Sequence, residues 1–310
     1  MAETKMKALR LHPPGTPQAL EYGDAPRPQP RPGEVLIRVV ATAITANELI
    51  WTETTKRTLP VPGHDVSGVV AAIGGKDNDF KIGELVFALT SFSRDGSAAE
   101  YVIALPSELA LKPETLTHEQ AAAVPLSALT AWQALFMHAD LKAGQRVLIT
   151  GAAGGVGVMA LQLAKWVDAY VIGTCSGRNS GFVKGLGADE VIDYTAATFE
   201  RAVDAVDVLL DCVGSSTLHR SWSLMKEGGV LVSVAEPPRD GESVKHADVK
   251  ATFFVVEPNG EQLSQIAALI EEGKIKPIVD SVLALSEGVK AFEQLAMGHS
   301  RGKVVLRISQ

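Results

Sequence analysis

The segment that most constrains the fold is VLITGAAGGVGVMALQLAK, residues 147–165. An apolar, strand-like run leads into a glycine-rich turn and then into a helix-like run, which is the order that a dinucleotide site requires. Gly154 would let the backbone approach a pyrophosphate, and Gly157 would let the helix pack closely on the strand. The N–H groups at the helix start, at Gly155 and Val156, would attract the phosphate charge. The segment predicts a dinucleotide site, and the alternative is a tight turn that binds nothing.

The runs around this segment indicate an α/β chain whose two parts have different sequence patterns. From RVLITG (146–151) to ATFFVVE (251–257), strand-like runs mostly alternate with helix-like segments. Such alternation implies a doubly wound parallel sheet with helices on both faces. The first third is punctuated instead by Gly and Pro between short β-branched runs such as 34–44 and 64–73, which indicates an irregular β domain.

The change in sequence pattern predicts where the domains meet. The segment THEQAAAVPLSALTAWQALFMHA, residues 117–139, is rich in Ala and Leu, and Thr117 and Gln120 have the spacing of a capping box. At 310 residues the chain is long enough for two domains. We expect a β-rich domain over 1–122 and 273–310 and a dinucleotide-binding domain over 123–272.

The end of the next strand-like run bears on the choice of cofactor. An NAD site has an acidic residue at the end of this strand. In YVIGTCSGRN, residues 170–179, no acidic residue stands there, and the run ends with Cys175, Ser176, Gly177 and Arg178 instead. A hydroxyl and a guanidinium suit a ribose 2′-phosphate, which a carboxylate would repel. NADPH is therefore the expected cofactor, and the alternative is that Arg178 is an ordinary solvated surface residue.

The composition and the charge limit the classes of partner that the protein is expected to bind. The formal net charge is −7, and there is no long Lys/Arg run, which argues against a nucleic acid or an anionic membrane and favours a small-molecule substrate. No apolar run approaches the roughly 20 residues that span a bilayer, and the first residues lack the apolar centre of a secretory signal. A cytoplasmic location is expected. The two cysteines, Cys175 and Cys212, cannot build a cysteine-based zinc cluster.

Five motifs together give the chain a family resemblance. They are GHDVSGVVAAIG (63–74), AAVPLSALTAW (122–132), AAGGVGVMALQLAK (152–165), DCVG (211–214) and GKVVL (302–306). On these motifs the chain resembles the medium-chain dehydrogenase/reductases and, among them, the zinc-independent quinone oxidoreductases. The resemblance covers nearly the whole length. It implies a GroES-like catalytic domain joined to a Rossmann domain, with Ala152 at the first fingerprint glycine.

The resemblance also implies that no metal is bound. Zinc-dependent relatives hold their catalytic metal on a Cys, a His and a further Cys. Here only His64 remains, because Thr45 and Leu126 match the two cysteine positions and neither side chain can replace a thiolate. His64 is then expected to be a hydrogen-bonded structural histidine, and the alternative is a direct catalytic role.

The resemblance places two residues at the chemistry. Asn47 matches an Asn that relatives place beside the nicotinamide and the substrate, and Thr130 matches a Thr near the nicotinamide, although Thr130 is as well explained by packing. The chain also departs from its relatives. Glu48 follows the Asn directly where relatives have Pro, and Trp51 or Thr52 stands near a tyrosine position.

Further cofactor residues follow from the same resemblance. Tyr194 matches a tyrosine that contacts the 2′-phosphate, and Gly214 lies in a turn beside the cofactor. Phe254 and Val255 lie where the family backbone meets the nicotinamide amide, with ordinary packing as the alternative for Phe254.

Without a metal, the substrate itself has to stabilise the charge that a hydride leaves behind. Quinones and α,β-unsaturated carbonyl compounds do so, because hydroquinone and enolate anions are delocalised and can accept hydrogen bonds. An NADPH-dependent quinone or enone reductase is the expected function. The alternatives are an enoyl reductase of a biosynthetic pathway and a non-catalytic NADPH-binding sensor or scaffold. A homodimer is expected, because ATFFVVE is apolar enough to pair across a two-fold axis.

Overall fold

The computed structural model describes residues 4–75, 79–196, 203–239, 241, 248–298 and 300–308. The chain divides into two compact units. The first unit contains Met1–Leu126, Glu257–Gly273 and Pro277–Gln310, and the second contains Ser127–Val256 and Lys274–Lys276. The division after residue 126 lies close to the expected boundary after residue 122.

The first unit is built on a seven-stranded sheet. Its strands run in the order β14-β15-β3-β4-β5-β7, with β6 paired to β3. Alternate residues of a strand face one side of the sheet, and here Val35, Ile37 and Val39 enter the apolar core. The strands are β3 (Val35–Ile44), β4 (Asp65–Ile73), β5 (Leu85–Leu89), β6 (Tyr101–Ala104), β7 (Leu109–Leu111), β14 (Val279–Ala284) and β15 (Lys303–Arg307).

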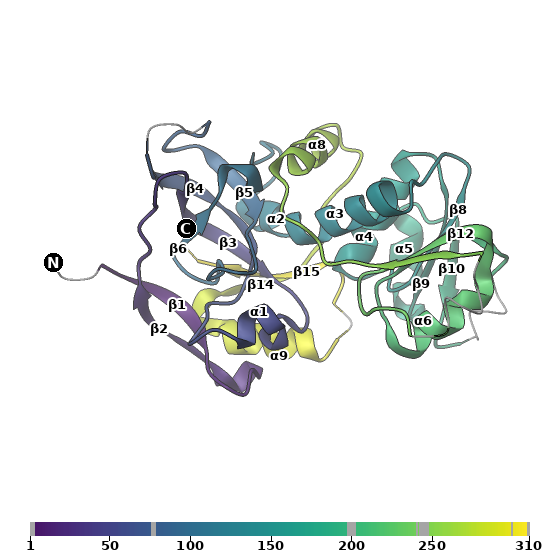
Figure 1. The fold of residues 1–310 in the computed structure, drawn as a ribbon, viewed down its shortest axis with the longest axis horizontal. Helices are drawn as coiled ribbons and strands as arrows, with labels where there is room; N and C mark the ends of the chain where they lie inside the picture. The colour runs from purple at the N-terminus through teal and green to yellow at the C-terminus, as the bar shows by residue number, and fades with distance from the viewer. Residues whose placement is uncertain are drawn as a thin grey trace. The chain divides into compact units, whose positions relative to one another are not determined.

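The pairing of β15 with β3 brings the end of the chain to the site. The two strands are antiparallel, and Val304 stands opposite Ile44. Lys303, at the start of β15, therefore lies beside Thr45, the residue that follows β3. A separate hairpin of β1 (Lys5–Leu11) and β2 (Leu20–Pro26) lies next to α9 (Gly288–Ala296), as Figure 1 shows.

The remaining helices of this unit are short apart from α8. They are α1 (Thr52–Thr55), α2 (His118–Ala122), α8 (Gly260–Glu271) and the 3-10 turns η1 (Pro17–Ala19), η2 (Glu48–Ile50), η3 (Pro106–Glu108) and η8 (Leu285–Glu287). The capping box at Thr117 and Gln120 is confirmed, since the Thr117 side chain accepts from the Gln120 N–H and the Gln120 side chain accepts from the Thr117 N–H.

The helix α8 differs in its placement from the sequence expectation. Residues 257–272 were expected in the dinucleotide-binding domain, whereas the structure groups 257–273 with the first unit. The reason is a close approach, because a Cβ on Gly260 would overlap the backbone of Leu109 in β7. The Thr115 N–H also donates to Glu271 Oε1 at 3.3 Å.

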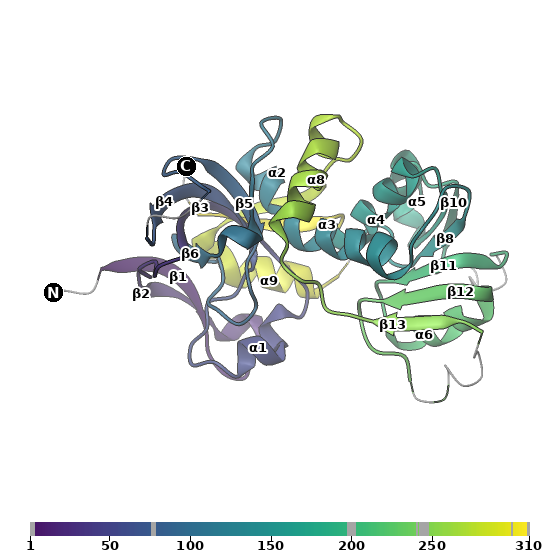
Figure 2. The same ribbon diagram turned by 45° about the horizontal axis from the view of Figure 1, so that its top comes forward.

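The second unit has a six-stranded parallel sheet, which confirms the Rossmann fold. The order is β10-β9-β8-β11-β12-β13, and Figure 2 shows β11, β12 and β13 side by side. Strand order reverses between β8 and β11, and ligands of such sheets bind outside the carboxyl ends of the strands at this point. The strands are β8 (Arg146–Ile149), β9 (Tyr170–Cys175), β10 (Glu190–Asp193), β11 (Val206–Asp211), β12 (Met225–Ser233) and β13 (Lys250–Phe253).

The helices of the second unit follow the strands. They are α4 (Gly155–Trp166), α5 (Ser180–Gly185), α6 (Ser215–Ser221), the π-helix η4 (Gln133–His138) and the 3-10 turns η5 (Gly177–Asn179) and η7 (Trp222–Leu224). A further helix, α3 (Pro125–Trp132), begins in the first unit and continues into the second. The described part of the chain contains no helix long and apolar enough to cross a membrane.

Candidate functional site

The glycine-rich turn after β8 has the geometry of a phosphate cradle. A Cβ on Gly157 would overlap the Gly151 carbonyl oxygen and the backbone of Ala152, so only glycine lets α4 start this close to the strand. A Cβ on Gly154 would meet only the Gly151 oxygen, at 3.3 Å, which leaves room for a ligand. No side chain caps α4 at Gly154, and the first N–H groups of a helix have no intrahelical partner. The turn therefore fits a pyrophosphate.

The structure shows what Ala152 and Gly151 do in this turn. Ala152 is fully buried, and its N–H donates to the Thr174 carbonyl oxygen at 2.9 Å. This hydrogen bond ties the turn to β9. The tight left-handed conformation belongs to Gly151, with φ of 64°, which sequence reasoning did not single out. Gly155 and Val156 are half-buried at the start of α4.

A buried carboxylate ties together the strand ends at the reversal point. Asp211 is fully buried and accepts hydrogen bonds from the Thr150 hydroxyl at 2.9 Å and the Ser233 hydroxyl at 3.0 Å. It also accepts from the N–H of Gly214 at 3.0 Å. Gly214 is buried, with φ of 74°, and precedes α6. Asp211 thus fixes the turn that the resemblance places beside the cofactor.

The residues expected to read a 2′-phosphate come together at the ends of β9 and β10. Asp193 pairs with Cys175, and the Tyr194 N–H donates to the Cys175 carbonyl oxygen at 3.2 Å. Tyr194 therefore stands beside the turn that carries Ser176 and Arg178. Arg178 is exposed, Ser176 is half-buried and Tyr194 is 49% exposed.

A carboxylate at the end of β10, which sequence reasoning missed, lies against the same turn. A Cβ on Gly177 would overlap the Asp193 carboxylate, which therefore lies against the turn between Ser176 and Arg178. Hydrogen bonds from the Thr195 hydroxyl and N–H, and then from the Gly177 and Ala196 N–H groups, hold the pKa of Asp193 below its usual range. Asp193 is thus ionised at neutral pH. Its place beside the turn comes from the parallel pairing of β10 with β9, which a local sequence pattern does not show.

The remaining second-unit residues lie just after β13 and within α3. Phe254 and Val255 follow β13 rather than forming part of it, and Val255 is 63% exposed. The Phe254 ring lies 4.3 Å from the ring of His138, between centroids. Thr130 is buried within α3.

In the first unit, Asn47 has a backbone conformation that explains its residue type. Its φ is 65° and its ψ is 1°, in the left-handed region that Asn tolerates better than most residues. The side chain is exposed. Trp51 is half-buried four residues later, with its ring 5.3 Å from that of Phe92 in an edge-on arrangement.

A buried polar cluster lies behind this loop. The Lys303 ammonium lies 3.0 Å from Asp65 Oδ2, with the side chains 6% and 1% exposed. The same ammonium donates to Thr45 Oγ1 at 2.7 Å. The other oxygen of Asp65 accepts from the Leu126 N–H. Three segments that are distant in the sequence therefore meet around one buried cation.

Glu48 is a second buried carboxyl group at this cluster. It is 1% exposed, and burial raises the pKa of Glu48 to about 8. The charge of Lys303 and the N–H groups of Thr45 and Gly63 oppose the shift, and the charge of Asp65 adds to it. Glu48 is therefore predominantly protonated at neutral pH. The sequence showed only that Glu48 replaces a proline of the relatives.

His64 is buried beside the cluster and is hydrogen-bonded, as expected. Its Nδ1 lies 3.4 Å from the Thr90 hydroxyl, and its ring lies edge-on to Phe92 with centroids 5.0 Å apart. Burial, then the charges of Arg57 and Arg94, lower the pKa of His64 to about 4. The imidazole is neutral under ordinary conditions.

The donor set around His64 does not fit a catalytic zinc. Of the two residues that the resemblance matches to cysteines of zinc-dependent relatives, Leu126 offers no ligand atom, and Thr45 accepts a hydrogen bond from an ammonium that would repel a dication. The described residues contain no group of three or more His, Cys, Asp or Glu side chains that could hold a metal ion.

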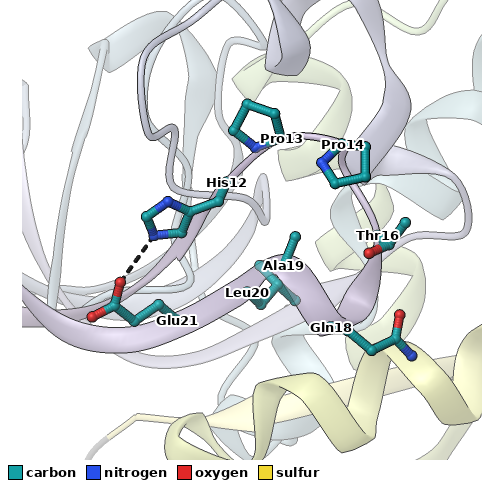
Figure 3. Close-up of a pocket in the computed structure, with 8 residues that line it drawn as sticks. All are labelled: His12, Pro13, Pro14, Thr16, Gln18, Ala19, Leu20 and Glu21. Atoms are coloured by element: carbon teal, nitrogen blue, oxygen red, sulfur yellow. Dashed lines mark hydrogen bonds and ion pairs between the residues drawn. The ribbon is translucent and has the colours of Figure 1, made fainter.

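A surface pocket of about 450 Å³ lies elsewhere in the first unit, at the turn between β1 and β2. Figure 3 shows its residues, with His12 Nε2 2.9 Å from Glu21 Oε2. None of the residues expected at the site lines it. We therefore do not assign this pocket a role in the reaction.

Comparisons with known proteins point to one family. Residues 31–114 match the alcohol dehydrogenase GroES-like domain, and residues 186–306 match the family described as zinc-binding dehydrogenase. A probable zinc-binding oxidoreductase, mitochondrial, of Arthroderma benhamiae is 42% identical over 318 residues, which cover 95% of this chain and 94% of the relative. The 2-methylene-furan-3-one reductase of Solanum lycopersicum is 36% identical over 90% of this chain and 73% of the relative.

A solved structure of the same kind is similar to this chain over nearly its whole length. The quinone oxidoreductase from Coxiella burnetii has a TM-score of 0.93 and 34% sequence identity, with coverage of 98% of this chain and 100% of that one. The similarity therefore extends across both units and is not limited to the dinucleotide-binding fold.

Proposed function

The chain belongs to the medium-chain dehydrogenase/reductases of the quinone oxidoreductase type, and we propose that it transfers a hydride from NADPH to a quinone or to the C=C bond of an α,β-unsaturated carbonyl compound. It is an oxidoreductase of a family that uses a nicotinamide cofactor. The finer assignment concerns the choice of cofactor, the class of substrate and the absence of a metal from the reaction.

One observation carries the proposal. Lys303 donates to Thr45, the residue that the family resemblance matches to a cysteine ligand of zinc-dependent relatives. A hydride added to a simple aldehyde leaves the charge localised on one oxygen, which a Lewis acid stabilises in zinc-dependent enzymes. A conjugated substrate delocalises the charge that the hydride leaves, so that hydrogen-bond donors are enough to stabilise it.

The residues of the chain then have distinct roles. The glycine-rich turn and the start of α4 bind the pyrophosphate of NADPH, which supplies the hydride when bound. The Asn47 amide donates to the substrate carbonyl oxygen, and this hydrogen bond strengthens as the oxygen becomes an enolate or hydroquinone oxygen. Solvent protonates the product. The name of the tomato relative, a 2-methylene-furan-3-one reductase, supports a conjugated ketone as a substrate class.

The preference for NADPH rests on the turn after β9. Arg178 is exposed there, Tyr194 lies next to the start of this turn, and the turn between β9 and α5 itself carries no acidic residue. The Asp193 carboxylate opposes the preference, since it lies against Gly177. We expect the guanidinium to outweigh it, because Asp193 is already hydrogen-bonded within its own turn.

Arg178→Ala is expected to weaken NADPH binding by about 1.5–3 kcal/mol and to spare NADH, because a charged hydrogen bond to the 2′-phosphate is lost. Cofactor titrations followed by nicotinamide fluorescence measure both affinities. Asp193→Asn is expected to move the preference in the opposite sense by tightening NADPH binding. Arg220→Ala, at an exposed arginine of α6, is the control. Equal losses for NADPH and NADH in Arg178→Ala would mean that Arg178 is structural.

A substrate screen tests the proposed function. NADPH oxidation is expected with quinones or with enones and short enals, and it is expected to persist after treatment with a zinc chelator. Preference for an enoyl thioester would indicate an enoyl reductase of a biosynthetic pathway. Stoichiometric binding of NADPH without turnover on any of these compounds would favour a sensor or scaffold and would end the proposal.

A homodimer and a cytoplasmic location stay predictions. The dimer is supported by β13, which lies at the edge of the parallel sheet, and by the exposure of Phe253 and Val255 at its end. The mass of the protein in solution, one chain or two, decides the first, and fractionation of the source cells decides the second.

A further inference from the structure

We propose that the Thr45 hydroxyl is a second hydrogen-bond donor to the substrate oxyanion and that the buried Lys303 ammonium positions and polarises it. The pair takes the place of the metal cation of zinc-dependent relatives. This inference rests on the proposed function, since it names further residues for the same reaction.

The direction of one hydrogen bond carries the argument. An ammonium group has only protons to offer, so the 2.7 Å contact from Lys303 Nζ makes Thr45 Oγ1 the acceptor. The hydroxyl proton is left to point elsewhere, and no side chain or carbonyl in the described ranges accepts it. Thr45 is half-buried, and Asn47, two residues later, is exposed, so the loop carries two polar donors close together in the sequence.

The cation behind Thr45 is held rigidly. Asp65 binds it at 3.0 Å and is itself fixed by the Leu126 N–H. The backbone of Lys303 is fixed by the pairing of β15 with β14 and β3. A donor that needs no reorientation when charge develops stabilises that charge more than water does. Accepting a charged hydrogen bond also makes a hydroxyl a stronger donor, because hydrogen bonds in a chain polarise one another.

The charges around the cluster leave the effect of the cation intact. Among the described residues, Asp65 is the one carboxylate that forms an ion pair with Lys303. Glu48, the other carboxyl group nearby, has its pKa raised to about 8 by burial and so adds little negative charge at neutral pH. His64 lies beside the cluster and is neutral, because burial lowers its pKa to about 4. Arg57 and Arg94, which act on His64, are paired with Asp95 and Glu108.

The first experiment removes the hydroxyl and keeps the shape. Thr45→Val is expected to lower kcat for an enone about 10- to 100-fold, with the affinity for NADPH unchanged, and Thr45→Ser is expected to restore most of the rate. A kcat of the Thr45→Val variant within twofold of the wild type would overturn the proposal. Thr45 would then serve only as a hydrogen-bond acceptor for Lys303.

A binding measurement separates this proposal from the proposed function. The probe is 4-nitrophenolate, a planar conjugated oxyanion, titrated against the NADP⁺ complex at a pH where the phenol is ionised. Thr45→Val is expected to weaken its binding about 10-fold. A wild type that binds the phenolate but turns over no quinone or enone would refute the proposed function alone. A wild type that turns over enones, with equal phenolate affinity in Thr45→Val, would refute the role of Thr45 alone.

The second experiment tests the role of Lys303 through Thr45. Lys303→Met combined with Asp65→Asn removes both charges of the buried pair together. Its kcat is expected to fall about as far as that of Thr45→Val, and the triple variant is expected to be no slower than Thr45→Val, since both changes remove one interaction. Multiplied losses in the triple variant, or an unchanged kcat in the double variant, would show that Lys303 acts on structure only.

Discussion

Lys303→Met is expected to lower the free energy of unfolding by about 3–5 kcal/mol, because it leaves the Asp65 carboxylate buried without its cation. Asp65 is 1% exposed, and Lys303 is its ion-pair partner at 3.0 Å. The ammonium also stabilises the loop after β3 through Thr45. Urea unfolding of the wild type and the variant at neutral pH measures the change.

Two further variants show whether the buried charge is the cause. Asp65→Asn in the Lys303→Met background keeps an acceptor for the Leu126 N–H, and it is expected to recover most of the loss. Lys290→Met removes an exposed ion pair with Glu287, whose side chains are 71% and 46% exposed, and it is expected to cost less than about 0.5 kcal/mol. A similar small loss in Lys303→Met would show that the buried pair contributes little to stability.

Asn47→Gly is expected to lower kcat about 100-fold with little change in NADPH affinity, because it removes an amide donor to the developing oxyanion. Glycine is the appropriate replacement, since Asn47 has a φ of 65° and alanine would add backbone strain. An amide does not titrate near neutrality, so the pH profile of the remaining activity is expected to keep its shape. Steady-state kinetics with an enone measure both quantities.

The matched control makes the same backbone change away from the loop. Asp168 is exposed and has a φ of 59°, and Asp168→Gly is expected to leave kcat unchanged. Asn47→Asp retains a residue type that tolerates this conformation and places an acceptor where the donor was. It is therefore expected to be at least as slow as Asn47→Gly. Full activity in Asn47→Asp would exclude hydrogen-bond donation by this side chain.

Local patterns were sufficient for much of the fold. The run from 147 to 165 predicted a strand, a turn and a helix, and the structure has β8, a glycine-rich turn and α4 in that order. The capping box at Thr117 is also a local signal, because its two partners are three residues apart. The GroES-like fold of the first unit came from the resemblance, since short β-branched runs alone indicated only an irregular β domain.

The features that were missed depend on contacts between distant segments. The ion pair between Lys303 and Asp65 joins residues far apart in the sequence, and it is created by the pairing of β3 with both β15 and β4. Asp193 reaches the cofactor turn only through the pairing of β10 with β9. The position of α8 depends on its approach to β7, for which a single glycine gives no warning. Periodicity and spacing carry no information on such contacts.

The central claim is that the hydride reaches the conjugated carbon of the substrate and not the carbonyl carbon. The most direct test uses NADPH that carries deuterium at the transferred position of nicotinamide C4, with a simple enone, and locates the label in the product by NMR. Deuterium at the β-carbon of a saturated ketone is the predicted result. Deuterium at the carbinol carbon of an allylic alcohol would contradict the account and would assign this chain to direct carbonyl reduction.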